Sequence, residues 1–123
     1  MPRRFGLLEI AINFDTFDYR AVCVVGPQKK LERYVQWAFS DKTFSLQQKT
    51  YEGLFLSRDG VEPIVWIPCK PKTPKDYGTL VHECMHLVHY MMNWANISLT
   101  DDTDEIYGFV LGHTVNSIIR GLR

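Results

Sequence analysis

The chain has 123 residues, of which 46% are hydrophobic, and its 14 basic side chains balance its 14 acidic ones. This length predicts one domain with a single core and leaves no room for an additional substrate domain. Zero net charge argues against nucleic acid as a partner, and no apolar run reaches the roughly eighteen residues that a membrane span needs. The cysteines, Cys23, Cys69 and Cys84, lack paired spacing, so we expect a reducing, cytoplasmic compartment rather than a disulfide framework.

The first half of the chain predicts two strands, a helix and a β-hairpin, in that order. Alternating or β-branched residues favour strands over 7–14 and 19–25. Apolar residues at helical spacing then predict a helix over about 27–40. Two further strands, 49–56 and 61–67, are expected on either side of Asp59-Gly60, a pair that is typical of hairpin turns.

A long helix is predicted to begin at Thr73. Thr73 is a favourable N-cap, Pro74 suits the first helical position, and Asp76 lies three residues after the cap. Apolar residues then cover most of the helical circumference, which is typical of a buried central helix. A second helix is expected over about 103–120, and the short polar loop before it predicts that the two helices are antiparallel.

The long helix carries the motif His82-Glu83-Cys84-Met85-His86. Histidines four residues apart lie on one face of a helix, so both imidazoles are expected to converge on one metal ion. Glu83 is rotated by about 100° and would reach a water on that ion. This layout predicts a zinc hydrolase site. The alternative is a pair of core histidines satisfied by hydrogen bonds, with Glu83 at the surface.

A catalytic zinc needs a third protein ligand and one open coordination position. His89 lies on the same face as His86, but its backbone is about 10 Å along the axis from that of His82. Met92 offers only a thioether, which is a poor zinc ligand. Glu105, nineteen residues after His86 and in the first turn of the second helix, is the preferred candidate.

Two glycines on the face of Glu105 favour this assignment. Gly108 and Gly112 have no side chain to hold another backbone away, so we expect them to let the two helices approach closely. The alternative is that Glu105 is only a first-turn acid favoured by the helix dipole. Three nearby acids could take its place as ligand: Asp101, Asp102 and Asp104.

With Glu105 following it, the His82-Glu83-x-x-His86 motif resembles that of the glutamate-zincin metallopeptidases. The segment Asp104-Glu105-Ile106-Tyr107-Gly108-Phe109-Val110-Leu111 is similar to the second helix of compact intracellular members related to the ImmA/IrrE group. Similar short peptidases are encoded in phage genomes, which would place the protein in the host cytoplasm. The likeness covers roughly 63–120. It implies one zinc ion bound by His82, His86 and Glu105, with Glu83 as general base.

The order of elements predicts an α+β domain over 1–123, with a strand, helix and hairpin half, 1–68, and a metal-site helical pair, 73–120. The resemblance implies a minimal zincin-like fold, in which a small, mostly antiparallel, curled sheet packs on the active-site helix and the helix that follows. In zincins an edge strand beside the active helix holds the substrate backbone, and Pro63 fits an edge position. The expected substrate strand is Val61, Glu62, Pro63, Ile64, Val65, Trp66 and Ile67.

The implied reaction is hydrolysis of a polypeptide by a zinc-activated water. Glu83 would take a proton from the attacking water and deliver it to the leaving amine, while a further donor stabilises the oxyanion. Candidates for that donor, or for a residue that hydrogen-bonds to a metal ligand, are His113, Tyr90, Tyr107, His89 and Asp104.

An alternative function is a catalytically silent binding or accessory module, for example a phage protein that grips a host or virion partner. The site would be structural if His89 or Cys84 closed the fourth coordination position. Nucleic-acid binding through local basic clusters is the class with the least support.

Overall fold

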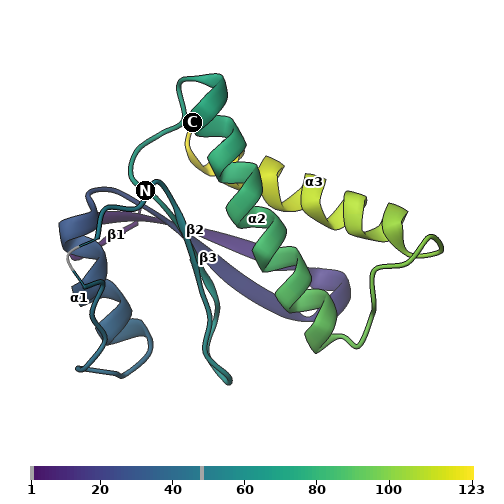
Figure 1. Cartoon of the computed structure of the whole chain (residues 1–123), viewed down its shortest axis with the longest axis horizontal. Helices are drawn as coiled ribbons and strands as arrows, with labels where there is room; N and C mark the ends of the chain where they lie inside the picture. Colours follow the sequence, from purple (N-terminus) through teal and green to yellow (C-terminus); the bar gives the residue numbers. More distant parts are fainter. Residues whose placement is uncertain (1, 48) are drawn as a thin grey trace.

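A mixed five-stranded sheet separates two helical layers in the part of the chain that the computed structural model describes, residues 2–47 and 49–123 (Figure 1). The sheet order is β1-β2-β3-β5-β4; β3 and β5 are parallel, and the other neighbours are antiparallel. The elements in chain order are β1 (Arg3–Arg4), β2 (Leu7–Phe14), the short 3-10 helix η1 (Asp15–Phe17), β3 (Tyr19–Val25), α1 (Gln28–Ala38), β4 (Leu54–Leu56), β5 (Ile64–Ile67), α2 (Pro74–Trp94) and α3 (Asp104–Gly121).

Strand alternation sends side chains to both faces of the sheet, and each face has its own apolar cluster. Cys23 and Val25 of β3 pack with α2 and α3, whereas Val24 packs with α1. β5 is buried along its whole length, because it is a central strand with helices on both faces. Its Trp66 is fully buried and donates from Nε1 to the Gly26 carbonyl oxygen at 3.0 Å. The core therefore lies on both sides of β3 and β5.

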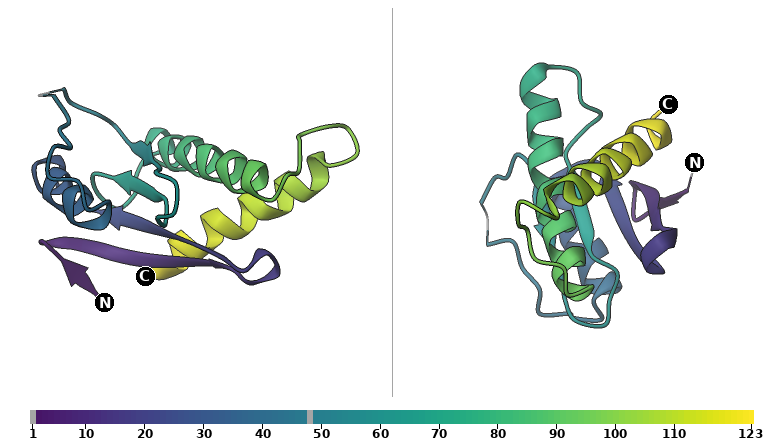
Figure 2. Two further views of the ribbon diagram at one scale, coloured as in Figure 1. Left: turned by 90° about the horizontal axis from the view of Figure 1, so that it is seen from below. Right: turned by 90° about the vertical axis from the view of Figure 1, so that its right-hand side faces the viewer.

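The long helix α2 begins with a capping box. The Thr73 hydroxyl accepts from the Asp76 amide, and the Asp76 carboxylate accepts from the Thr73 amide, each at 3.2 Å. α2 lies over the sheet (Figure 2). α3 runs antiparallel to α2 and crosses α2 at an oblique angle. α3 also packs against β2. No helix among the described residues is long and apolar enough to cross a membrane.

The predicted α+β class and most predicted elements are confirmed. β2 and β3 cover 7–14 and 19–25, as the alternation of the sequence predicts. α1 covers 28–38 where the sequence predicts 27–40, and α3 covers 104–121 where it predicts 103–120. Local patterns of this strength therefore decide the secondary structure here.

The sheet and its surroundings differ from the expectation in four respects. It is open rather than curled, and α1 covers the face opposite to α2 and α3, where its apolar stripe of Leu31, Tyr34 and Val35 is buried. β4 has three residues instead of the predicted 49–56. The Asp59-Gly60 turn lies within a longer loop, 57–63, in which the Val61 amide donates to the Arg58 carbonyl at 3.2 Å.

Candidate metal centre

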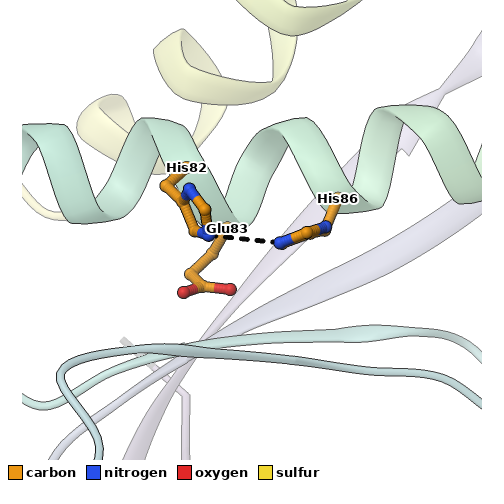
Figure 3. Close-up of side chains that lie close together, drawn as sticks. All are labelled: His82, Glu83 and His86. Carbon is orange, nitrogen blue, oxygen red and sulfur yellow. Dashed lines mark hydrogen bonds between the residues drawn. The ribbon is translucent and has the colours of Figure 1, made fainter.

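His82 and His86 project from one face of α2 and bring their ring nitrogens together (Figure 3). Their Nε2 atoms are 3.2 Å apart, and the ring planes are at 87° to each other. Two nitrogens bound to one tetrahedral zinc at about 2.0–2.1 Å would be separated by about 3.3 Å. The two imidazoles are therefore spaced as two ligands of one ion, as the four-residue separation predicts.

Glu83 is buried, with 8% of its surface exposed, whereas both histidines are exposed. One ligand atom from each of the three side chains lies within 4.8 Å of the others, so the three residues could hold a metal ion. Burial raises the pKa of the Glu83 carboxyl, and the neighbouring imidazoles of His82 and His86 act in the opposite direction. The group combines two accessible nitrogen ligands with a carboxylate in a drier environment, an arrangement suited to proton transfer.

The Glu83 side chain lies against Gly53, which directly precedes β4. A Cβ atom on Gly53 would be 3.1 Å from Glu83 Cγ, 3.3 Å from Glu83 Oε2 and 2.8 Å from Thr79 Cγ2. The absence of a side chain at Gly53 therefore lets the edge of the sheet approach α2 at the carboxylate. Sequence reasoning missed Gly53, because a glycine marks a close approach only once the facing element is known.

We expect Gly53→Ala to displace the Glu83 side chain and to lower the free energy of unfolding by about 1–3 kcal/mol, the usual cost of overpacking. Gly78→Ala is the matched control, because a Cβ atom at Gly78 meets no atom within 4 Å. Alanine there should raise the free energy of unfolding by up to about 1 kcal/mol through helix propensity. Urea denaturation measures both variants. If Gly53→Ala were as stable as the wild-type protein, the close approach would be contradicted.

Aromatic side chains of β4 and α2 flank the histidines. The Phe55 ring stacks on His86 with centroids 6.3 Å apart and planes at 22°, and it lies 5.7 Å from the Tyr90 ring. The Tyr90 hydroxyl donates to Asp59 Oδ1 at 3.4 Å, which connects α2 to the loop between β4 and β5. Phe55 was not a sequence candidate for the site, because its contact with α2 depends on the order of strands in the sheet.

The expected substrate strand does not lie at an edge of the sheet, so its predicted edge position is wrong. β5 is paired with β3 on one side and β4 on the other, and the Pro63 carbonyl accepts from the Val22 amide at 3.1 Å. The side chains of Ile64–Ile67 are buried. The edge strand next to α2 is β4. The residues to which this correction applies are Val61, Glu62, Pro63, Ile64, Val65, Trp66 and Ile67.

Glu105 is not brought to the histidines. Its side chain is exposed and lies outside the group formed by the motif residues. Tyr107 occupies the face of α3 that turns toward α2: its ring is 5.4 Å from that of His89, and its hydroxyl donates to the Ile97 carbonyl at 2.6 Å. Two residues correspond to about 200° of helical rotation, so Glu105 points away from α2. In this arrangement Glu105 does not complete the ligand set.

The expected close approach of the two helices at Gly108 and Gly112 is wrong. A Cβ atom on either glycine would meet no atom within 4 Å, and both residues are exposed on the side of Glu105. Gly121 does allow a close approach, but to the sheet rather than to α2. A Cβ atom on Gly121 would be 2.5 Å from Ile10 Cγ2. Of the three glycines in α3, only Gly121, the last residue of the helix, allows a close approach.

Two further histidines lie outside the group of three. His113 Nε2 is 2.7 Å from the Asn13 carbonyl oxygen, and its ring packs on Phe14, so this side chain belongs to the contact of α3 with β2. His89 is half-buried against Tyr107. Neither of them, nor the buried Cys84, joins the metal-binding group.

The remaining candidates divide into exposed acids and one tyrosine. The acids at the start of α3 are exposed: Asp101, Asp102 and Asp104. Tyr90 stays next to the site, because it lies one turn after His86 and contacts Phe55. Of the candidates for a supporting contact, Tyr90 is therefore the one that the structure places beside the metal-binding group.

Comparison with known proteins gave no match. No protein-family model, no curated protein and no solved structure matches the chain. The glutamate-zincin resemblance therefore stays an expectation from the sequence, and of its implied ligands the structure brings together His82 and His86 but not Glu105.

Proposed function

We propose that this protein is a zinc-dependent hydrolase that acts on a polypeptide. One observation carries the proposal: two Nε2 atoms lie 3.2 Å apart on one helical face, with a carboxylate within 4.8 Å. Nitrogens at this distance either share a proton in a hydrogen bond, the contact drawn in Figure 3, or bind one cation. Nitrogen ligands with a neighbouring carboxylate suit zinc better than calcium or magnesium, which prefer oxygen ligands.

The residues of the motif have separate roles in this proposal. His82 and His86 would hold the ion with one protein ligand fewer than catalytic zinc sites usually have. The stacked Phe55 ring restricts the orientation of His86. When bound, zinc would lower the pKa of a coordinated water toward about 7 and polarise a neighbouring carbonyl. Glu83 takes the proton from the attacking water and gives it to the leaving amine. Its burial, which raises its pKa, makes it a better base than an exposed glutamate.

Tyr90 is the donor that we assign to the oxyanion. It follows His86 by one helical turn, and its hydroxyl makes a long contact, 3.4 Å, with Asp59 and also lies close to the Ser57 side chain. A contact of this length is weak, so the hydroxyl is free to turn toward a substrate oxygen. His113 and His89 are less suitable, because each is packed into another contact of α3.

An extended substrate would bind along the outer edge of β4. β4 is the last strand in the sheet order, and its Phe55 contacts His86, so a peptide added to this edge would pass beside the histidines. Backbone pairing at an edge strand requires no particular substrate sequence. β4 thus takes the place of 61–67 as the substrate strand.

The setting that we propose is a reducing compartment such as the cytoplasm. All three cysteines are free, and Cys69 is exposed, whereas an oxidising compartment favours paired cysteines. The balanced charge supports a polypeptide rather than a nucleic acid as the partner.

A metal-carrying binding module without catalysis is the second candidate. It is favoured by the ligand set, because within residues 2–47 and 49–123 only the two histidines and Glu83 gather around one point. In such a module Glu83 would be a third ligand rather than a base. Hydrolysis that disappears in Glu83→Gln while zinc is retained would separate the enzyme from the module.

Zinc content tests the proposal directly. We expect about one zinc per chain in protein that is purified without a histidine tag and without added metal, as measured by elemental analysis. After removal of the metal with a chelator, zinc should bind again more tightly than magnesium or calcium, since the site offers two imidazoles. Protein that retains no transition metal and takes up no zinc in the titration would overturn the proposal.

A further inference from the structure

The outer face of α3 is largely exposed to solvent, and His113 at its margin contacts Asn13 and Phe14 of β2. Phe109 is 79% exposed, the highest value among the large hydrophobic side chains of residues 2–47 and 49–123, and Ile106 is 45% exposed. The surface beside them, which we call the α3 outer face, is formed by Glu105, Gly108, Phe109, Gly112, His113 and Asn116. This face therefore presents a large aromatic ring and two glycines to solvent.

The packing within the chain does not explain these glycines. Gly121 of the same helix is required by the close approach of Ile10, but Gly108 and Gly112 have no neighbour within 4 Å of a Cβ position. Glycine weakens a helix interior relative to alanine. The backbone at Gly108 and Gly112 is thus accessible to another helix that packs from outside the chain.

The charges of α3 are separated along its length. Asp104 and Glu105 lie in the first turn, and Arg120 lies in the last turn. Within residues 2–47 and 49–123 none of the three takes part in an ion pair. Glu105 and Arg120 are fifteen residues apart, which is about 22 Å along the axis, so they cannot pair within one helix.

We propose that the α3 outer face binds the same face of a second copy of this chain, with the two α3 helices antiparallel. Pairing the helices about their midpoints places Gly112 near the symmetry axis and sets Glu105 of one copy opposite Arg120 of the other. The arrangement is self-complementary, as a two-fold interface must be. It covers Phe109 of both copies and gives the glycines a close backbone contact.

The distribution of charge along α3 favours a second copy of the chain as the partner and an antiparallel orientation of the two helices. A parallel pair would bring the acidic turns of both copies together and their basic turns together, which is unfavourable. An antiparallel pair replaces both repulsions with attraction and also opposes the two helix dipoles. The metal site is not part of this surface, so the interaction does not depend on the proposed function.

A charge-reversal cycle tests the proposal by sedimentation velocity. The wild-type protein should be a dimer at micromolar concentration. Glu105→Arg and Arg120→Glu should each raise the dimer dissociation constant about tenfold or more, because each creates like-charge contacts at two symmetric positions. The double variant, Glu105→Arg with Arg120→Glu, should restore the wild-type constant, which only a contact between copies allows.

Two controls accompany this cycle. Arg33→Glu reverses an exposed charge on α1 and should leave the dissociation constant unchanged. Zinc content should be the same in all variants, which separates this test from that of the metal site. Gly112→Leu leaves the charges intact and should also weaken the dimer, because it blocks the backbone contact. A monomer at the highest soluble concentration, or a double variant that is not restored, would overturn the proposal, whatever else then binds this face.

Discussion

Replacing His86 by alanine is expected to abolish the retention of zinc. His82 and His86 are the only nitrogen ligands in the metal-binding group of the described residues, so the variant keeps one imidazole and one carboxylate. Removing a residue that only hydrogen-bonds to a metal ligand typically lowers metal affinity by roughly 10–100-fold. Removing the ligand His86 itself should lower zinc affinity by more than that. His86 is exposed, so the free energy of unfolding should change by no more than about 0.5 kcal/mol. Competition with a chromophoric chelator measures the affinity.

His89→Ala is the matched control for this measurement. His89 lies three residues later on the same helix, but its ring packs on Tyr107 and it is outside the metal-binding group. We expect this variant to retain zinc and to lose stability instead, because a half-buried contact between α2 and α3 is removed. Equal loss of zinc from His86→Ala and His89→Ala would show that the ligand set differs from the pair at 3.2 Å.

Glu83→Gln is expected to abolish hydrolysis while the zinc and the fold remain. Glutamine has the shape of glutamate but cannot accept a proton in the step assigned to Glu83, and general bases typically contribute about 10²–10⁴-fold to the rate. The variant does not leave a buried charge, so the fold should be at least as stable as that of the wild-type protein. Cleavage of fluorescently labelled, unfolded casein by zinc-loaded protein provides the rate, and elemental analysis provides the metal content.

Glu52→Gln serves as the control for a carboxylate near the site. Glu52 precedes Gly53, but it is exposed and pairs with Lys75 at 2.8 Å. Its removal should leave the rate of cleavage unchanged, because exposed ion pairs contribute little. Full activity of Glu83→Gln would exclude Glu83 as the base, and zinc-loaded wild-type protein without any hydrolysis would favour the binding module.

The part of the site that lies within one helical turn could be predicted from the sequence. The convergence of His82 and His86 follows from helical geometry alone, and the N-cap at Thr73 is a local signal that the capping box confirms. The burial of Glu83 could not be predicted in the same way. It depends on Gly53 and β4, and the pairing of β4 with β5 at the far edge of the sheet is a long-range property.

The rotation of α3 is the second property that the sequence left open. α3 has apolar residues around most of its circumference, including Ile106, Tyr107, Phe109 and Val110, so periodicity does not reveal which face packs inward. The contacts of Tyr107 with His89 and Ile97 decide the rotation. A glutamate and two glycines on one face were consistent with either rotation, and the structure turns them outward.

The order of strands in the sheet is the third property that could not be predicted from the sequence. A run of four apolar residues such as Ile64–Ile67 indicates a strand that is buried on both faces, which already argues against an edge position. Pro63 suggested an edge, but it lies just before the strand, where a missing amide hydrogen does not interrupt the ladder.

The contact between Gly53 and Glu83 shows that one part of the site depends on local contacts and the other on contacts between residues far apart in the sequence. The two imidazoles meet through a four-residue separation, whereas thirty residues separate Gly53 from the carboxylate that it touches. A helical peptide spanning 73–95 would therefore present both nitrogens to an ion and yet leave its glutamate fully hydrated. In the folded chain, by contrast, the segment at Gly53 and β4 excludes water from that carboxylate, and this burial raises its pKa.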